Sequence, residues 1–305
     1  MSHTHRCQQS ALLLLSFCLG ACEWLYPPYA TELLLQLEPS EAMHESAGDQ
    51  AEGAIRHRLA AGGFRRAEVI REKDLLRVRL VKGADLAFAT QLLTRRAELE
   101  LRLVDTAGGT ALATASIPEG SRVRLVTEKV RGRDGIARES YFTADRKEDL
   151  ATLLGPLVSS GRRLAFGPLT PEQVGGEQRF RSWVLAGQPS LTGERVDNAR
   201  VVQVPELGTY MVAVELDEDG TRSFEELTAA HVGERVAIML DGMVNSAPVI
   251  QEKISGGHLR ISLSQGRTAQ ENQQEARDLA LVLKAGKYPL RAKLISTQTL
   301  NEGTK

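Results

Sequence analysis

The sequence predicts an α+β fold built from two regular halves. Apolar and charged residues alternate over 75–81 and over 99–103, as in strands with one solvated face. Apolar residues four apart (Ala51, Ile55 and Leu59) indicate a helix, and Gly62-Gly63 ends that stretch as a helix C-terminus requires. The 305 residues are 42% hydrophobic and 25% charged, ordinary values for a globular chain with a sizeable core.

The first half is predicted to contain six elements. An apolar strand over 33–37 is stopped by Pro39, and a helix over about 49–61 follows. Strands over 68–71 and 75–81 flank a tight turn, and a helix over about 85–96 leads to a strand over 99–103. This order predicts a ferredoxin-like (βαββαβ) base, with two helices on one face of an antiparallel sheet.

The middle of the chain, residues 106–190, is less regular. Residues 123–130 and 137–142 predict a hairpin around Asp134-Gly135, which is a strong turn pair. A short helix is expected over 147–154. The pairs Gly155-Pro156, Gly167-Pro168 and Gly175-Gly176 then interrupt the sequence, so we expect short strands and long loops there.

Residues 191–286 are regular again. Strands are expected over 210–216, 236–240, 244–251 and 259–263, with Asp241-Gly242 as a two-residue hairpin turn and Pro248 at an edge or bulge. Capping boxes at 223–226 and 268–271 predict helices reaching about His231 and Gly286. A strand over 290–295 follows. This half also alternates α and β elements.

The N-terminus predicts export. Residues 11–21 are apolar, but the run is shorter than the roughly 20 residues that span a bilayer, which favours a signal peptide. The run ends in Leu19-Gly20-Ala21-Cys22, which resembles the bacterial lipobox. That resemblance implies cleavage before Cys22 and a lipid on its thiol. An ordinary signal peptide cut near Ala21 and a buried N-terminal helix are the alternatives.

The cysteines agree with this prediction. Cys7, Cys18 and Cys22 all lie in or beside the predicted signal, and residues 23–305 contain none. After cleavage the lipid would cap the last thiol, so zinc sites with thiolate ligands and cysteine nucleophiles are excluded. We therefore expect a lipoprotein of the bacterial cell envelope that faces the periplasm, on the inner or the outer membrane.

The residues themselves indicate no chemistry. A net charge of −1 and a pI near 6.6 argue against nucleic-acid binding. Nucleotide, hydrolase and metal-ligand motifs are absent from the sequence, so we expect no enzyme, no cofactor, no metal and no small-molecule substrate. An acid at Asp241 with a facing carboxylate is the enzymatic alternative. Residues 217–220 (Asp-Glu-Asp-Gly) indicate a solvated turn, and Arg131, Arg133 and Arg138 a solvated basic hairpin.

Several segments resemble the large periplasmic P1 domain of the SecD and SecDF family. In the first half these are residues 55–64, 69–81 and 97–104; in the second they include 191–199, 214–224, 236–250 and 254–262. The motif positions matched in the second half, which the resemblance implies are structural or partner-binding, are Thr192, Gly193, Phe224, Asp241, Gly242, Ser246, Pro248, Gly256 and Gly257.

The resemblance implies a domain division and a function. The expected segments are a lipoprotein signal peptide (1–21), a linker (22–30), the ferredoxin-like base (31–105), an inserted α+β head subdomain (106–286) and a C-terminal strand and tail (287–305). The implied role is binding of unfolded exported polypeptide, or of translocon subunits, in support of protein export. The family's transmembrane helices are missing here, so no proton-driven motor is expected. The alternative is a non-catalytic envelope scaffold that binds a folded partner.

Overall fold

The computed structural model describes residues 29–38, 45–96, 98–132, 135–169, 179–263, 268–285 and 291–300. They form two compact units. Unit 1 comprises residues up to Thr94 together with those from Pro289 onward, and unit 2 comprises Arg95–Tyr288. The predicted mixture of α and β structure is confirmed. The signal peptide and Cys22 lie outside the described residues, and Tyr29 and Ala30 of the expected linker already belong to the first strand.

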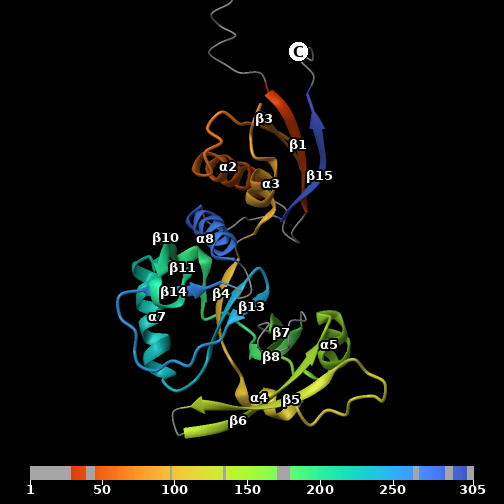
Figure 1. Cartoon of the computed structure of the whole chain (residues 1–305), viewed down its shortest axis with the longest axis vertical. Coiled ribbons are helices and arrows are strands. Elements are labelled where there is room, and N and C mark those ends of the chain that lie inside the picture. Colours follow the sequence, from red (N-terminus) through yellow and green to blue (C-terminus); the bar gives the residue numbers. More distant parts are fainter. Residues whose placement is uncertain are drawn as a thin grey trace, which may run out of the picture. The chain divides into compact units, whose positions relative to one another are not determined.

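Unit 1 is a four-stranded antiparallel sheet with two helices. Its elements are β1 (Tyr29–Glu38), α2 (Glu45–Ala61), β2 (Glu68–Glu72), β3 (Leu75–Val81), α3 (Leu86–Thr94) and β15 (Arg291–Thr299). The strands follow the order β15-β1-β3-β2. The helices lie on one side of the sheet (Figure 1). That face carries the apolar half of each alternating strand, and its buried members include Leu33, Leu35, Leu37, Leu76, Val78 and Leu80.

The boundary expected at residue 105 is wrong. The strand at 99–103, expected to complete the first sheet, lies in unit 2, and β15 from the C-terminal segment pairs with β1 instead. Leu99 and Leu101 are both buried, but between two strands of the other sheet. Alternation identifies a strand and its buried face, but it does not identify the strand's neighbours.

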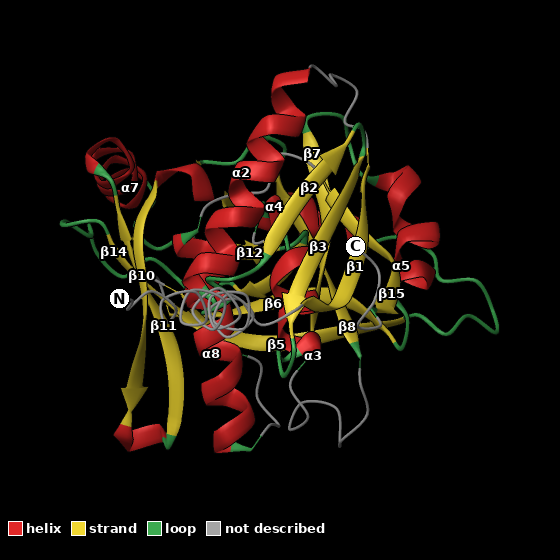
Figure 2. Ribbon diagram, turned by 90° about the horizontal axis from the view of Figure 1, so that it is seen from above, coloured by secondary structure: helices red, strands yellow, loops and turns green. Residues whose placement is uncertain are grey.

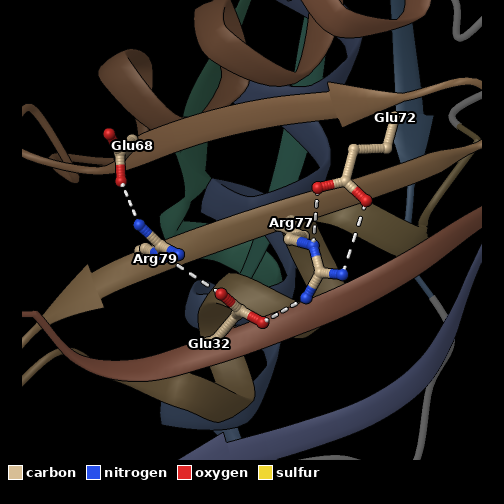
Figure 3. A network of polar contacts seen from close by, with 5 residues as sticks. All are labelled: Glu32, Glu68, Glu72, Arg77 and Arg79. Atoms are coloured by element: carbon tan, nitrogen blue, oxygen red, sulfur yellow. Dashed lines mark hydrogen bonds and ion pairs between the residues drawn. The ribbon is translucent and has the colours of Figure 1, made fainter. Parts of the chain in front are cut away.

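The opposite face of the unit 1 sheet carries a network of charges (Figure 3). Glu32 on β1 is only 6% exposed and accepts hydrogen bonds from Arg77 (3.0 Å) and Arg79 (3.0 Å) on β3. These arginines also pair with Glu72 (3.2 Å) and Glu68 (3.1 Å) on β2. Burial acts to raise the pKa of Glu32, but the hydrogen bonds from Arg79 and Arg77 outweigh it and hold the pKa below 4.5.

Unit 2 contains an eight-stranded and a three-stranded sheet. The larger has the order β5-β6-β8-β7-β13-β12-β4-β9 and the smaller β10-β11-β14. The strands of the two sheets together are β4 (Leu99–Leu103), β5 (Arg124–Gly132), β6 (Gly135–Ala144), β7 (Arg162–Pro168), β8 (Phe180–Ala186), β9 (Leu191–Thr192), β10 (Val196–Val204), β11 (Thr209–Leu216), β12 (Val236–Leu240), β13 (Met243–Ser246) and β14 (His258–Ser262).

The helices of unit 2 are α4 (Thr106–Leu112), α5 (Lys147–Leu154), α7 (Glu218–Ala230) and α8 (Ala269–Lys284). Helix α8 packs along β10 and β11, where Figure 2 shows it beside both strands. The predicted capping box at its start is confirmed: Thr268 and Glu271 exchange both hydrogen bonds. Gly286, its expected end, lies outside the described residues.

The sequence also predicted a turn at 217–220 and a hairpin in the middle of the chain. The turn expected at 217–220 is wrong: Asp217 accepts a hydrogen bond from the Gly220 amide (2.6 Å) and is the N-cap of α7. The helix therefore starts nearly two turns before the predicted capping box at 223–226. The hairpin expected in the middle of the chain is confirmed by the pairing of β5 with β6, although Asp134 itself lies outside the described residues. Within the described residues no helix is long and apolar enough to cross a membrane.

Replacing Glu32 with Gln tests the charge network. Because the pKa of Glu32 is lower in the folded state, its contribution is complete above pH 4.5 and is lost as the pH falls through the folded value. We expect Glu32→Gln to lower the free energy of unfolding by about 1 kcal/mol at pH 7, a figure discounted because both arginines are partly solvated. The deficit should shrink below pH 4.5, measured by urea unfolding at several pH values.

Glu72→Gln is the matched control, because Arg77 is the one ion-pair partner of Glu72 among the described residues and the Glu72 side chain is 55% exposed. It should cost less than about 0.5 kcal/mol at any pH. A Glu32→Gln deficit that stays constant from pH 7 to pH 3.5 would contradict the assignment.

Candidate functional site

The predicted motif residues mostly hold strands and turns together. Asp241 and Gly242 have φ angles of 50° and 81°, as a two-residue turn of type I′ requires, and they join β12 to β13. The Asp241 carboxylate accepts a hydrogen bond from the Glu98 amide (2.9 Å), and the Asp241 amide donates to the Glu98 carbonyl (3.0 Å). Arg95 lies 3.8 Å from the same carboxylate. Asp241 thus fixes the segment that enters β4.

Thr192 and Gly193 lie on the other edge of β4. Thr192 in β9 pairs with Glu100, and a Cβ at Gly193 would lie 3.3 Å from that of Leu99. Ser246 at the end of β13 pairs with Ile238, and the Pro248 carbonyl accepts a hydrogen bond from the Val236 amide (3.0 Å). These four residues therefore surround the strands β4 and β12.

The remaining motif residues lie around α7. Gly256 and Gly257 have φ angles of 88° and 65°, and a Cβ at Gly257 would clash with the Thr221 hydroxyl oxygen. Phe224 is only 4% exposed. In the part of the chain that the structure describes, the nine motif residues thus fall into two groups, one around β4 and β12 and the other around α7. In the described part of the chain there is no group of three His, Cys, Asp or Glu residues placed to hold a metal ion.

A groove of about 490 Å³ lies elsewhere in unit 2, between α4, α5 with the 3-10 turn Gly155–Leu157, and β8. This volume is in the range of sites that take apolar groups. Leu157, 52% exposed, stands at the groove. The apolar residues that line it are Ala111, Leu112, Ala115, Leu153, Val158 and Val184.

Gly108 allows α4 to approach β8 beneath the groove. Asp105 caps α4 by accepting a hydrogen bond from the Gly108 amide (2.8 Å), and Asp105 also pairs with Arg162 at the groove. A Cβ at Gly108 would come within 2.5 Å of the Asp105 carboxylate and 3.0 Å of Val184. Below the groove, Leu112, Leu150, Leu154 and Phe142 belong to one buried cluster. The groove is therefore built on a packed base.

The sequence prediction did not locate this groove. Its residues come from 108–116, 153–162 and 184, mostly in the stretch that the sequence predicts to be irregular. One signal was available. The run Leu150–Val158 has more apolar residues than one helix face can bury, and Leu157 and Val158 follow Pro156, beyond the end of the helix.

A buried arginine, Arg181, links three strands of the large sheet. The Arg181 guanidinium lies 3.7 Å from the ring centre of Tyr141 and 3.8 Å from that of Trp183, and it pairs with Glu128 and Glu139 at 3.2 Å each. Burial lowers the pKa of Arg181, and the carboxylates oppose that shift. Burial, followed by the charge of Glu128, raises the pKa of Tyr141. This cluster joins β5, β6 and β8.

Comparison with known proteins places the fold. The family model described as the SecDF P1 head subdomain matches residues 170–290. Protein translocase subunit SecD of Desulfurispirillum indicum is 30% identical over 261 residues, which is 85% of this chain and 42% of that protein. The chain belongs to the SecD/SecDF P1 domain family. SecD of Magnetococcus marinus is 35% identical over 164 residues, 54% of this chain and 30% of that protein.

Solved SecDF structures share the fold. SecDF in a super-membrane-facing form aligns with 95% of this chain and 35% of that chain, with a TM-score of 0.57 and 23% identity. A second structure, described as a membrane component SecDF that enhances protein export, aligns with 87% of this chain and 98% of that one, with a TM-score of 0.52 and 24% identity. The SecD-like chain spans less than half the length of the curated SecD relatives. Most groove residues lie before residue 170, where the head model begins.

Adjacent glycines of α4 provide a matched test of the groove's packing. We expect Gly108→Ala to lower the free energy of unfolding by about 1–3 kcal/mol, because the added methyl group meets Asp105 and Val184. Nothing lies within 4 Å of a Cβ at Gly109, so Gly109→Ala should be neutral or should stabilise by up to about 1 kcal/mol. Thermal unfolding measures both. Equal effects of the two changes would contradict this packing.

Proposed function

We propose that this chain is a lipid-anchored, non-enzymatic P1 domain of the bacterial envelope that binds unfolded or translocating polypeptide in support of protein export. Unit 1 would be its ferredoxin-like base, because the order β15-β1-β3-β2 with α2 and α3 is that of a split βαβ plait. Unit 2 would be its head. The lipid on Cys22 would hold the chain to the membrane on the side that faces the periplasm. Translocon subunits would be its neighbours there.

The single observation that carries the binding role is the groove beside α4 in a domain of the SecD/SecDF family. Unfolded chains expose apolar side chains that folded proteins bury, and burying them is favourable without any particular sequence. A groove lined by leucine, valine and alanine, with an exposed Leu157 at its side, suits such side chains. The proposal includes no proton-driven motion by this chain.

Leu157→Asp tests the groove. Burying a leucine against a client contributes about 1.5–3 kcal/mol, so loss of that contact should weaken binding of a labelled unfolded polypeptide roughly tenfold or more. Ile295→Asp is the matched control, because Ile295 is 48% exposed, lies in unit 1 and does not line the groove. Fluorescence anisotropy measures both. Equal loss in the two variants, or no loss in either, would contradict the groove's role.

Photocrosslinking in cells separates the proposed function from the scaffold alternative. A crosslinker at position 157 should capture many exported chains, whereas one at 295 should not. One dominant folded partner at position 157, with no nascent chains, would overturn polypeptide binding and favour a scaffold.

The lipid anchor has its own test. Cys22→Ser removes the only thiol that the lipobox resemblance assigns to acylation. We expect this variant to lose incorporation of labelled palmitate and to leave the membrane fraction, because two or more acyl chains are what gives stable anchoring. A Cys22→Ser chain that still fractionates with membranes and still carries the label would refute the anchor.

A further inference from the structure

The hairpin formed by β5 and β6 extends beyond the sheet to which it belongs. Strand β5 is the terminal strand of the eight-stranded sheet, and among the described residues β6 pairs with β8 at Thr143 and Ala144 alone. The remaining hairpin is a two-stranded ribbon (Figure 1). Within the described residues the outer edge of β5 pairs with no strand, so its backbone N–H and C=O groups are available to an added strand.

One face of this ribbon carries a pair of acids that is neutralised. Glu128 and Glu139 lie directly opposite each other in the β5–β6 register. Arg181 pairs with both at 3.2 Å, and Arg235 lies 3.4 Å from Glu139. Like charges directly opposite each other destabilise a sheet, and here the two arginines compensate them.

The other face carries a pair of bases that is not neutralised. Lys129 and Arg138 also lie directly opposite each other, and both are exposed. In the described part of the chain neither forms an ion pair. On the same face Thr127 and Ser140 form a hydrogen bond of 2.8 Å, which holds the two strands in this register. The register therefore places Lys129 and Arg138 side by side, and among the described residues no carboxylate pairs with either.

We propose that this basic face of the β5–β6 hairpin binds acidic stretches of extended polypeptide. The inference rests on the proposed function and adds a preference to it. A strand added along β5 would place alternate side chains on the face of Lys129, so carboxylates at every second position would meet the base pair. An extended polypeptide is favoured over an anionic lipid surface because only the polypeptide can also pair with the open β5 edge.

Three extended peptides of equal length test the preference: one with Glu at every second position, one with Gln and one with Lys at those positions. Anisotropy at low salt should show the Glu peptide binding about 3- to 10-fold tighter than the Gln peptide, as two solvated ion pairs allow. Lys129→Gln with Arg138→Gln should remove that difference. Arg260→Gln with Lys284→Gln, which changes the same charge at two exposed residues elsewhere in unit 2, should keep it.

A charge-reversal variant is the control for unfolding of the hairpin. Lys129→Glu with Arg138→Glu should switch the preference to the Lys peptide, and an unfolded hairpin could not produce that gain. Equal binding of the Glu and Gln peptides, or an acidic preference that survives Lys129→Gln with Arg138→Gln, overturns the inference. So does binding of the wild type to phosphatidylglycerol vesicles but not to the Glu peptide.

An apolar peptide separates this inference from the proposed function. If the apolar peptide binds the wild type and is weakened by Leu157→Asp, but the Glu and Gln peptides bind alike, then the groove role stands and the acidic preference fails. If no peptide binds the wild type, both fail.

Discussion

The arrangement of unit 2 depends on the pairing of β4 with a strand on each edge. Strand β4 is held between β12 and β9, which lie far from it in the sequence, so three distant stretches of chain meet at Leu99–Leu103. A buried strand has to satisfy its backbone groups on both edges. The Asp241 turn, which bonds to both backbone groups of Glu98, fixes where β4 begins. Six of the nine motif residues therefore support β4 or its neighbour β12: Thr192, Gly193, Asp241, Gly242, Ser246 and Pro248.

Local patterns in the sequence predicted what local interactions decide. The Asp241-Gly242 turn and the Thr268 capping box are examples, since each depends on residues within a few positions of one another. The start of α7 was missed because Asp217 competes with Ser223 as an N-cap, and both lie in sequences that suit the role. The partner of the strand at 99–103 could not be read, because its alternation is compatible with either sheet.

The two candidate binding surfaces also depend on long-range contacts that local sequence patterns do not predict. The groove is lined by residues of α4, α5 and β8. It depends on the close approach of α4 to β8, which Gly108 allows. The composition of its segments predicted loops, and no pairwise spacing in the sequence indicates that they converge. The basic hairpin was visible as arginines around a turn, but its significance comes from the strand register. The register of β5 against β6 determines which charged residues lie opposite each other. That register is a property of the folded sheet.

The pairing of β1 with β15 has a consequence for the order of folding. Unit 2 is one continuous stretch of chain, so it contains all of its own strands once residue 288 has been made. Unit 1 cannot complete its sheet until β15 arrives, because Thr31 pairs with Thr299 across almost the whole polypeptide. Contacts this distant close slowly. During synthesis β3 can pair with one edge of β1 soon after it is made, but the other edge of β1 stays without its partner until the end of the chain is available.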